Sequence, residues 1–285
     1  MASVNPETGP TQAPTTSPAS PVGLGPLSGA RELFEEVGDL TAFAGESFRC
    51  LPGAVQYISE TMRQTAQMIK GTTLLTFLLN LFFGAEIINF IYFFLASIGA
   101  SDELGVTGYA APRELATTMF CFIFSAKVGC GMTSEIGTMR INEEIDAFES
   151  TGVDPMRYVI ATRFGATLLF VPYATAISLF ALYIGQYFEA ITVLHGISPA
   201  SFSQVYWGIQ TSTDEIFALV TIGVVALSTT TVACFYGLRT HGGPAAVGDA
   251  VARSVVINLV LGITICSVFA AGFYGPNLHL ALGGG

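Results

Sequence analysis

The sequence predicts an all-α membrane protein with an N-terminal amphipathic helix at the membrane interface, five transmembrane helices, and a polar helix between the second and third spans. Hydrophobic residues make up 51% of the 285-residue chain and charged residues only 11%, with a mean hydropathy of +0.59, which is too apolar for an ordinary soluble domain. A membrane-spanning helix needs about 20 mostly apolar residues to cross about 30 Å of hydrocarbon. Five windows meet this requirement: 71–101, 115–132, 164–188, 216–238 and 254–274.

The charge balance excludes nucleic acid as a partner. The chain has 21 acidic and 11 basic residues, a formal net charge of −10, whereas nucleic-acid binding relies on Lys and Arg to neutralise phosphates. Five cysteines are scattered through apolar segments without metal-binding spacing, which favours small core residues over a disulfide framework.

Three regions follow one another along the chain. Residues 1–28 are rich in Pro, Thr, Ser and Ala, contain no Lys or Arg, and are predicted to be a disordered tail. Residues 29–70 form an interfacial helical segment, broken at Pro52 and ending at Lys70, and residues 71–285 form the transmembrane domain. The apolar stripe of the interfacial helix consists of Leu33, Phe34, Val37, Leu40, Ala44 and Phe48.

Lys and Arg placement predicts the orientation, because cytoplasmic loops retain positive charge. Most basic residues precede the first span, lie between the second and third spans, or lie between the fourth and fifth spans. Arg113, at the mouth of the second span, is the exception. The N-terminus is therefore expected in the cytoplasm and the C-terminus outside.

A polar island, 133–157, separates the second and third spans. Ile141, Ile145 and Phe148 fall on one face of a predicted helix, and Arg140, Glu143, Glu144 and Glu149 fall elsewhere. Gly152 and the pair Asp154-Pro155 predict that this helix stops and a new one starts. A docking surface for another protein and an ordinary solvated loop both fit this pattern.

Two charges lie inside the predicted spans. Glu86 is central in the first span, where Asn80 and Asn89 are candidate hydrogen-bond partners; it marks either a polar point on a transport route or a packing contact. Lys127 lies near the cytoplasmic end of the second span, so its ammonium group is expected to reach the interface. An ion- or proton-coupled carrier using Glu86 and Lys127 is the alternative function.

Longer motifs resemble the MlaE/YrbE permease family, the membrane subunits of MCE (mammalian cell entry) type lipid ABC transporters. The run 113–115, 126–129, 133–140, 143–147 and 153–158 reads R-E-L, A-K-V-G, T-S-E-I-G-T-M-R, E-E-I-D-A and V-D-P-M-R-Y. A second block begins with Tyr236-Gly237 and continues through 242–248 and 250–256. The ending 274–280 is similar to the B-type YrbE subunits of actinobacterial systems.

The resemblance implies that residues 133–154 are a coupling helix that docks in a groove of a separate ATPase. The chain lacks the G-x-x-x-x-G-K-[ST] phosphate-binding loop, so it is expected to be a non-catalytic permease subunit without cofactor or metal, with ATP and Mg²⁺ bound by the partner. The implied coupling residues are Glu135, Arg140, Glu143, Glu144, Asp146 and Phe148.

The same resemblance implies a lipid cavity between the first, second and fifth spans of two permease chains. The implied lipid-pathway residues are Phe77, Phe82, Glu86, Arg113 and Glu114. Arg113 suits an acidic headgroup, and an Arg113–Glu114 structural network is equally consistent. The family often has Gly-Pro after R-E-L, where this chain has Ala116-Thr117.

The implied partners are a cytoplasmic ABC ATPase dimer, a second YrbE-type permease that is either a paralogue or an identical chain, extracytoplasmic MCE proteins, and the lipid substrate. The implied location is the bacterial cytoplasmic membrane. The outer segment 189–210, with Tyr206 and Trp207, suits contact with an extracytoplasmic partner.

Overall fold

The computed structural model describes residues 26–195 and 197–274, so residues 1–25 of the tail predicted over 1–28 lie outside the described part, while residues 26–28 belong to a helix. The chain divides into two units, residues 1–39 and 40–285. In the first unit, residues 26–39 form the beginning of helix α1 (Pro26–Cys50). All further description concerns the second unit.

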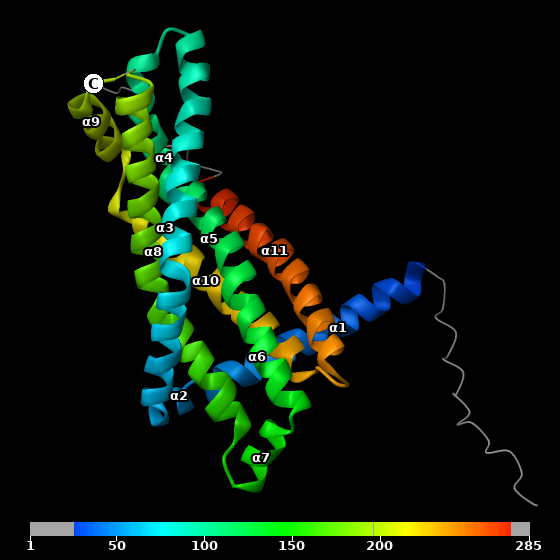
Figure 1. Ribbon diagram of the computed structural model, residues 1–285. Helices are drawn as coiled ribbons and strands as arrows, with labels where there is room; N and C mark the ends of the chain where they lie inside the picture. The colour runs from blue at the N-terminus through cyan, green and yellow to red at the C-terminus, as the bar shows by residue number, and fades with distance from the viewer. Residues whose placement is uncertain (1–25, 196, 275–285) are drawn as a thin grey trace, which may run out of the picture. The chain divides into compact units, whose positions relative to one another are not determined.

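The described residues contain five helical stretches that are long and apolar enough to cross a bilayer, which confirms the predicted all-α, five-span class (Figure 1). The second and third stretches each consist of shorter helical elements joined end to end, and the other three are single helices. In chain order the elements are α2 (Gly53–Gln56), α3 (Ile58–Ser97), η1 (Ser101–Val106), α4 (Thr107–Ala110), η2 (Ala111–Leu115), α5 (Ala116–Phe124), η3 (Ser125–Gly129), α6 (Cys130–Ile141), α7 (Glu144–Ser150), η4 (Met156–Ala161), α8 (Thr162–Phe188), η5 (Glu189–Val193), α9 (Pro199–Ile209), α10 (Ser212–Leu238) and α11 (Pro244–Tyr274).

Helix α3 runs through residues 70 and 71 without a break, so the expected boundary between interfacial segment and transmembrane domain falls inside one helix. The turn at Pro52 is present, and it separates α1 from the short helix α2. We refer below to the α7 end of the bundle, which carries α7, the start of α3 and the 239–243 loop. The opposite α9 end carries η1, α9 and the start of α10.

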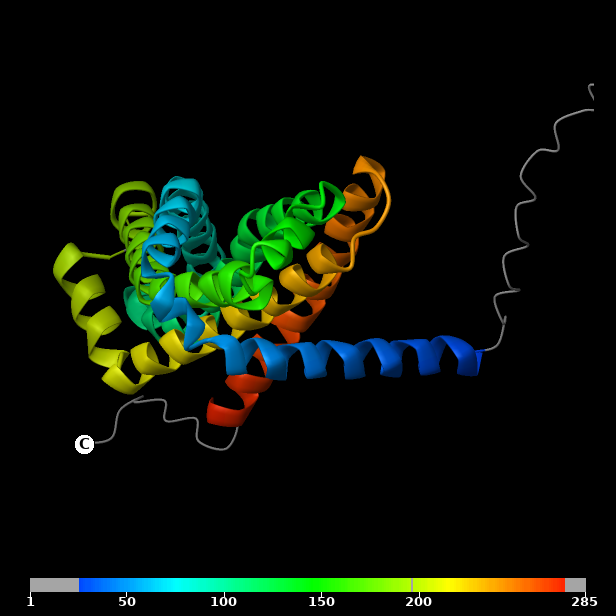
Figure 2. The same cartoon turned by 90° about the horizontal axis from the view of Figure 1, so that it is seen from below.

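Helices α3 and α8 lie side by side, as do α6 and α11 (Figure 2). Two glycines allow α3 and α8 to approach closely. A Cβ atom added at Gly84 would lie 2.5 Å from the carbonyl oxygen of Leu182, and one added at Gly185 would collide with the carbonyl oxygen of Leu81. Small residues at such contacts are typical of membrane helix pairs, because they bring the backbones together.

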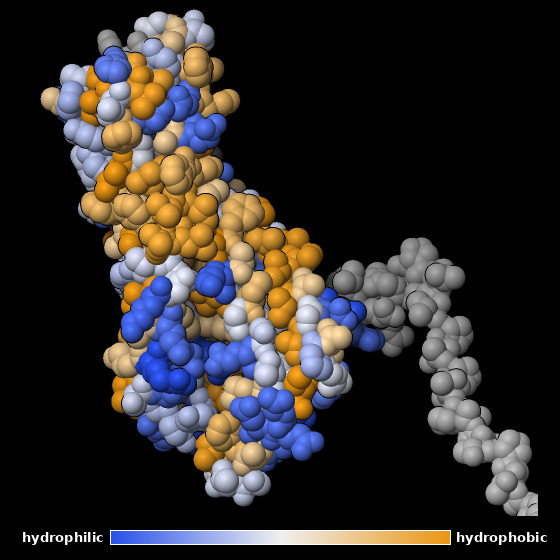
Figure 3. Space-filling model, viewed as in Figure 1, coloured by the Kyte–Doolittle hydropathy of each residue, from blue (hydrophilic) through white to orange (hydrophobic). Residues whose placement is uncertain are grey.

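The protein core lies between α5, α8 and α10, where Phe120, Phe124 and Phe170 are almost fully buried and stack on one another. By contrast, α3 and α11 expose large apolar side chains such as Phe82, Phe90 and Val260. Figure 3 shows hydrophobic side chains gathered along the middle of the bundle, with hydrophilic side chains towards the α7 end and a smaller hydrophilic group towards the opposite end. Apolar exposure on this scale suits contact with lipid.

Candidate functional site

The polar island forms two helices rather than one. Helix α6 ends at Ile141, where the amides of Asn142 and Glu143 donate to the carbonyl oxygens of Thr138 (3.0 Å) and Arg140 (3.2 Å). Glu143 then adopts a left-handed conformation with φ of 59°, and α7 starts at Glu144. The expectation of one helical face running from residue 141 to residue 148 is therefore wrong, because this turn changes the direction of the chain.

The predicted stop and restart at the end of α7 is confirmed. Gly152 has a φ of 80°, and its amide donates to the carbonyl oxygen of Glu149 (3.0 Å), while the amide of Val153 donates to that of Phe148 (3.0 Å). This pair of bonds is a Schellman motif, which closes a helix with glycine in the left-handed region. The next helix begins at once, since Asp154 Oδ1 accepts a 3.0 Å hydrogen bond from the amide of Met156.

Helix α7 packs by one side and exposes acidic groups on the other. Ile145 is buried, and the ring of Phe148 lies 5.0 Å from that of Tyr158. Glu143 and Glu144 are exposed. Arg140 and Asp146 form an ion pair of 2.6 Å across the α6–α7 turn, which holds α7 against the end of α6.

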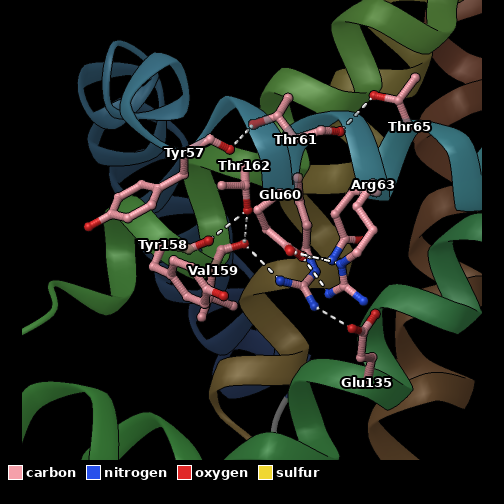
Figure 4. Close-up of polar contacts among 11 residues, drawn as sticks. Tyr57, Glu60, Thr61, Arg63, Thr65, Glu135, Tyr158, Val159 and Thr162 are labelled. Atoms are coloured by element: carbon pink, nitrogen blue, oxygen red, sulfur yellow. Dashed lines mark hydrogen bonds and ion pairs between the residues drawn. The ribbon is translucent and has the colours of Figure 1, made fainter. Parts of the chain in front are cut away.

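A buried arginine, Arg163, ties α6 to α8 near this hairpin, and Figure 4 shows its partners Glu135 and Val159. The Arg163 side chain is 3% exposed; its Nη2 lies 3.0 Å from Glu135 Oε1, and its Nη1 donates to the carbonyl oxygen of Val159 at 2.8 Å. The sequence marked Arg163 only as a basic residue next to a span. Its immediate apolar neighbours, such as Phe164, were the available signal that it is buried.

The start of α3 joins the same polar region. Arg63 donates to both carboxylate oxygens of Glu60, at 2.8 and 2.6 Å, and Gln64 donates to Glu60 Oε1 at 2.9 Å. These residues, together with Glu135, Arg163 and the inner side of α7, line an open cavity of about 640 Å³. The cavity brings the predicted coupling residues Glu135, Glu144 and Phe148 together with the base of the first span.

The lipid-pathway residues of the first span do not form a cluster with Asn80 and Asn89. Glu86 and Phe82 are exposed on the outer face of α3, and Phe77 is half-buried. Asn80 donates to the carbonyl oxygen of Thr76 (2.9 Å) and Asn89 donates to Glu189 (2.6 Å). The expected bonds from these amides to Glu86 are therefore absent among the described residues, because Asn80 bonds to its own helix and Asn89 reaches Glu189 of η5.

At the α9 end, Arg113 pairs with Asp214 rather than with its neighbour Glu114. Arg113 Nε lies 2.9 Å from Asp214 Oδ1, and its guanidinium carbon lies 3.6 Å from the centroid of the Tyr109 ring. Asp214 also accepts a 3.0 Å hydrogen bond from the amide of Thr211, which caps α10. Glu114 is exposed, so the structure does not bring these two predicted residues together.

The two intramembrane charges of the alternative carrier function are also separate. Lys127 lines a hollow together with Gly71 of α3, whereas Glu86 lies fifteen residues further along that helix. At 1.5 Å per residue this corresponds to a distance of about 22 Å along the axis. A shared proton or ion site formed by Glu86 and Lys127 is not supported by this spacing.

The outer segment forms an aromatic cluster on α9. The rings of Tyr206 and Trp207 lie 4.9 and 5.2 Å from that of Tyr183. Tyr206 is buried, and burial raises the pKa of its hydroxyl, which stays protonated at any physiological pH. Trp207 is 52% exposed and is available for a contact at this end.

Comparison with known proteins decides the family. A family model described as "Permease MlaE" matches residues 61–271, which is most of the chain. The chain belongs to the MlaE permease family. It is 31% identical over 182 residues to the probable ABC transporter permease protein slr1045 of Synechocystis, an alignment that covers 64% of this chain and 66% of the relative.

Two further relatives extend this comparison. The Arabidopsis thaliana protein TRIGALACTOSYLDIACYLGLYCEROL 1, chloroplastic, is 27% identical, covering 79% of this chain and 64% of the relative. A probable ABC transporter permease protein of Rickettsia felis is 23% identical, covering 80% and 88%. The chain thus spans just under two thirds of the length of the first two. Family and fold together identify it as a multi-pass membrane permease subunit.

Proposed function

We propose that this chain is the permease subunit of an ATP-driven, MCE-type lipid transporter, in which it forms the lipid translocation cavity and couples it to a separate ATPase. The observation that carries the proposal is the α6–α7 hairpin. It presents exposed carboxylates on a short helix that ends in the Schellman motif at Gly152 and is tied to α6 by the Arg140–Asp146 pair, while the Glu135–Arg163 pair ties α6 to α8. A braced helix transmits a push or pull that a loose loop would absorb.

A route from this hairpin to the lipid-facing helix follows the contacts already described. Movement of α7 reaches η4, which continues into α8, through the Phe148–Tyr158 ring contact, and it reaches α6 through the Arg140–Asp146 pair. Helix α8 in turn packs closely on α3 at Gly84 and Gly185. Force on α7 would therefore tilt α3, whose outer face carries Phe82 and Glu86, and would open or close a cavity shared with a second permease.

Two observations support a lipid as the substrate. The exposed aromatic and aliphatic face of α3 suits acyl chains, and one relative is named for a lipid, trigalactosyldiacylglycerol. In this proposal the α7 end faces the cytoplasm and the ATPase dimer, which binds ATP and Mg²⁺. The α9 end faces the extracytoplasmic MCE proteins, and Trp207 is available to contact them.

The proposal is tested by removing the exposed charges of the hairpin. In the double variant Glu143→Gln/Glu144→Gln, we expect the ATPase to be lost from the purified complex and ATP-dependent lipid transfer between vesicles to fall at least tenfold. Glu215→Gln is the matched control, since Glu215 is an exposed glutamate at the α9 end. An ATPase that remains bound, with transfer unchanged, would show that α7 is an ordinary loop and would favour an ion-coupled carrier.

A further inference from the structure

Lys127 lies at an unusual place in the second span. It is in η3, a wide π-helical turn between α5 and α6, and its side chain is exposed. Within the described part of the chain it has no hydrogen-bond or ion-pair partner. It shares a hollow with Gly71, where the first span predicted from the sequence begins, and this places it near the predicted edge of the hydrocarbon. A charge at this depth is costly unless it meets water or an anion.

Two hollows flank Lys127. A smaller one of about 140 Å³ lies between α3 and the η3–α6 segment, and a larger one of about 560 Å³ lies between α6 and the first turns of α11. Lys127 and Gly131 line both of them. No atom lies within 4 Å of the position of a Cβ on Gly131, so the absence of a side chain there keeps the two hollows open.

We propose that Lys127 and the two hollows beside it bind the negatively charged headgroup, phosphate or carboxylate, of a membrane lipid. Charge complementarity selects this occupant, because Lys127 is an unpaired cation at the level of the headgroups. Gln67 lines the smaller hollow and Ser134 the larger one, and both offer polar contacts. The acidic residue of the smaller hollow, Glu135, is already paired with Arg163. Met68 and Val251 offer apolar walls to the upper part of an acyl chain.

This inference depends on the membrane-spanning fold alone and not on the proposed coupling to an ATPase. Binding of an acidic lipid is measured without nucleotide, without the ATPase and without lipid transfer. If no binding is found, the proposed function is therefore unaffected. Conversely, loss of the ATPase in the α7 variant would not alter lipid retention at Lys127.

The test measures lipids retained by the full-length protein. The protein is purified from vesicles of equal parts phosphatidylglycerol and phosphatidylcholine, and the bound lipids are counted by native mass spectrometry. Wild-type protein should be enriched in phosphatidylglycerol, and Lys127→Gln should reduce that enrichment about fivefold, the effect of one cation near an anionic surface. Gly131→Leu should also reduce it while keeping the charge, because the added side chain projects into the space that Lys127 shares with Gly131.

Lys70→Gln is the matched control, since Lys70 is an exposed lysine on α3 that lines neither hollow. It should leave the enrichment unchanged. Equal losses in both lysine variants would show only general surface charge and would overturn the proposal, as would no loss in either. Competition by free inorganic phosphate would assign the site to a soluble anion instead. If Cys130 is protected from maleimide when the permease self-associates and no lipid is retained, this face is a contact between permease copies, which would also overturn the proposal.

Discussion

The close approach of α3 and α8 predicts that Gly84→Ala destabilises the protein, although alanine favours helices more than glycine does. The added Cβ would lie 2.5 Å from the carbonyl oxygen of Leu182, and real Cβ atoms rarely come nearer than 3.0 Å. Both atoms are fixed to backbone, so the clash is relieved only if the helices separate by about 0.5 Å or more. A gap of this size forfeits about a quarter of the dispersion energy along the contact.

Overpacking of this kind costs up to about 3 kcal/mol, and replacing glycine with alanine in a helix regains about 1 kcal/mol. The net expectation is a loss of about 2 kcal/mol in the free energy of unfolding, or a fall in Tm of about 4–8 °C for a chain of this size. Thermal unfolding of the purified protein can be followed by the fluorescence of Trp207, the single tryptophan.

Gly131→Ala is the control, because nothing lies within 4 Å of its added Cβ. It should melt at the wild-type temperature or slightly above, from helix propensity alone. If Gly84→Ala melts like Gly131→Ala, the two helices do not pack as closely as described and the route from α8 to α3 loses its basis. Gly185→Ala should behave like Gly84→Ala, and the double variant should cost less than the sum, since one separation relieves both clashes.

Three further predictions concern two ion pairs and the glycine that ends α7. Glu135→Gln leaves the buried cation of Arg163 without its carboxylate and should lower the free energy of chemical unfolding by about 1–2 kcal/mol. This is below the usual cost for a buried pair because the Glu135 side chain is 49% exposed. An unchanged unfolding midpoint would contradict this prediction. Gly152→Ala places a Cβ in the left-handed region at a cost of about 1–2 kcal/mol, and hydrogen exchange should speed up at the end of α7 while the spans stay protected. Asp214→Asn removes a charge partner of Arg113 and should cost about 2 kcal/mol; a variant as stable as wild type would show that the other contacts of Arg113, such as the Tyr109 ring, hold it without this carboxylate.

The five spans could be predicted from the sequence because apolar length alone defines them, and the Gly152 turn because glycine in the left-handed region has a recognisable context. The break at Glu143 could not be predicted in this way. A glutamate with positive φ carries no local signal, and the turn is held by the packing of Ile145 and the Arg140–Asp146 pair, which form only in the folded chain.

The partners of the charged residues could not be predicted from neighbouring sequence either. Sequence proximity suggested Arg113 with Glu114 and Glu86 with the nearby asparagines, whereas the structure pairs Arg113 with a residue 101 positions away and turns Asn89 towards Glu189. Helical periodicity tells which side chains share a face of one helix, but it does not tell which helix lies opposite that face. The neighbour of each span is set by tertiary packing, and long-range ion pairs depend on that neighbour.

The separation between Arg113 and Asp214 has a consequence for biosynthesis. The chain is made from the N-terminus, so Arg113 reaches the membrane long before α10 supplies its carboxylate, and the third span and α9 are made in between. Until then the guanidinium group depends on its other contacts, such as the ring of Tyr109 in the same part of the chain. Closure of this pair is therefore a late event in assembly, and in a chain arrested before α10 Arg113 would lack this carboxylate.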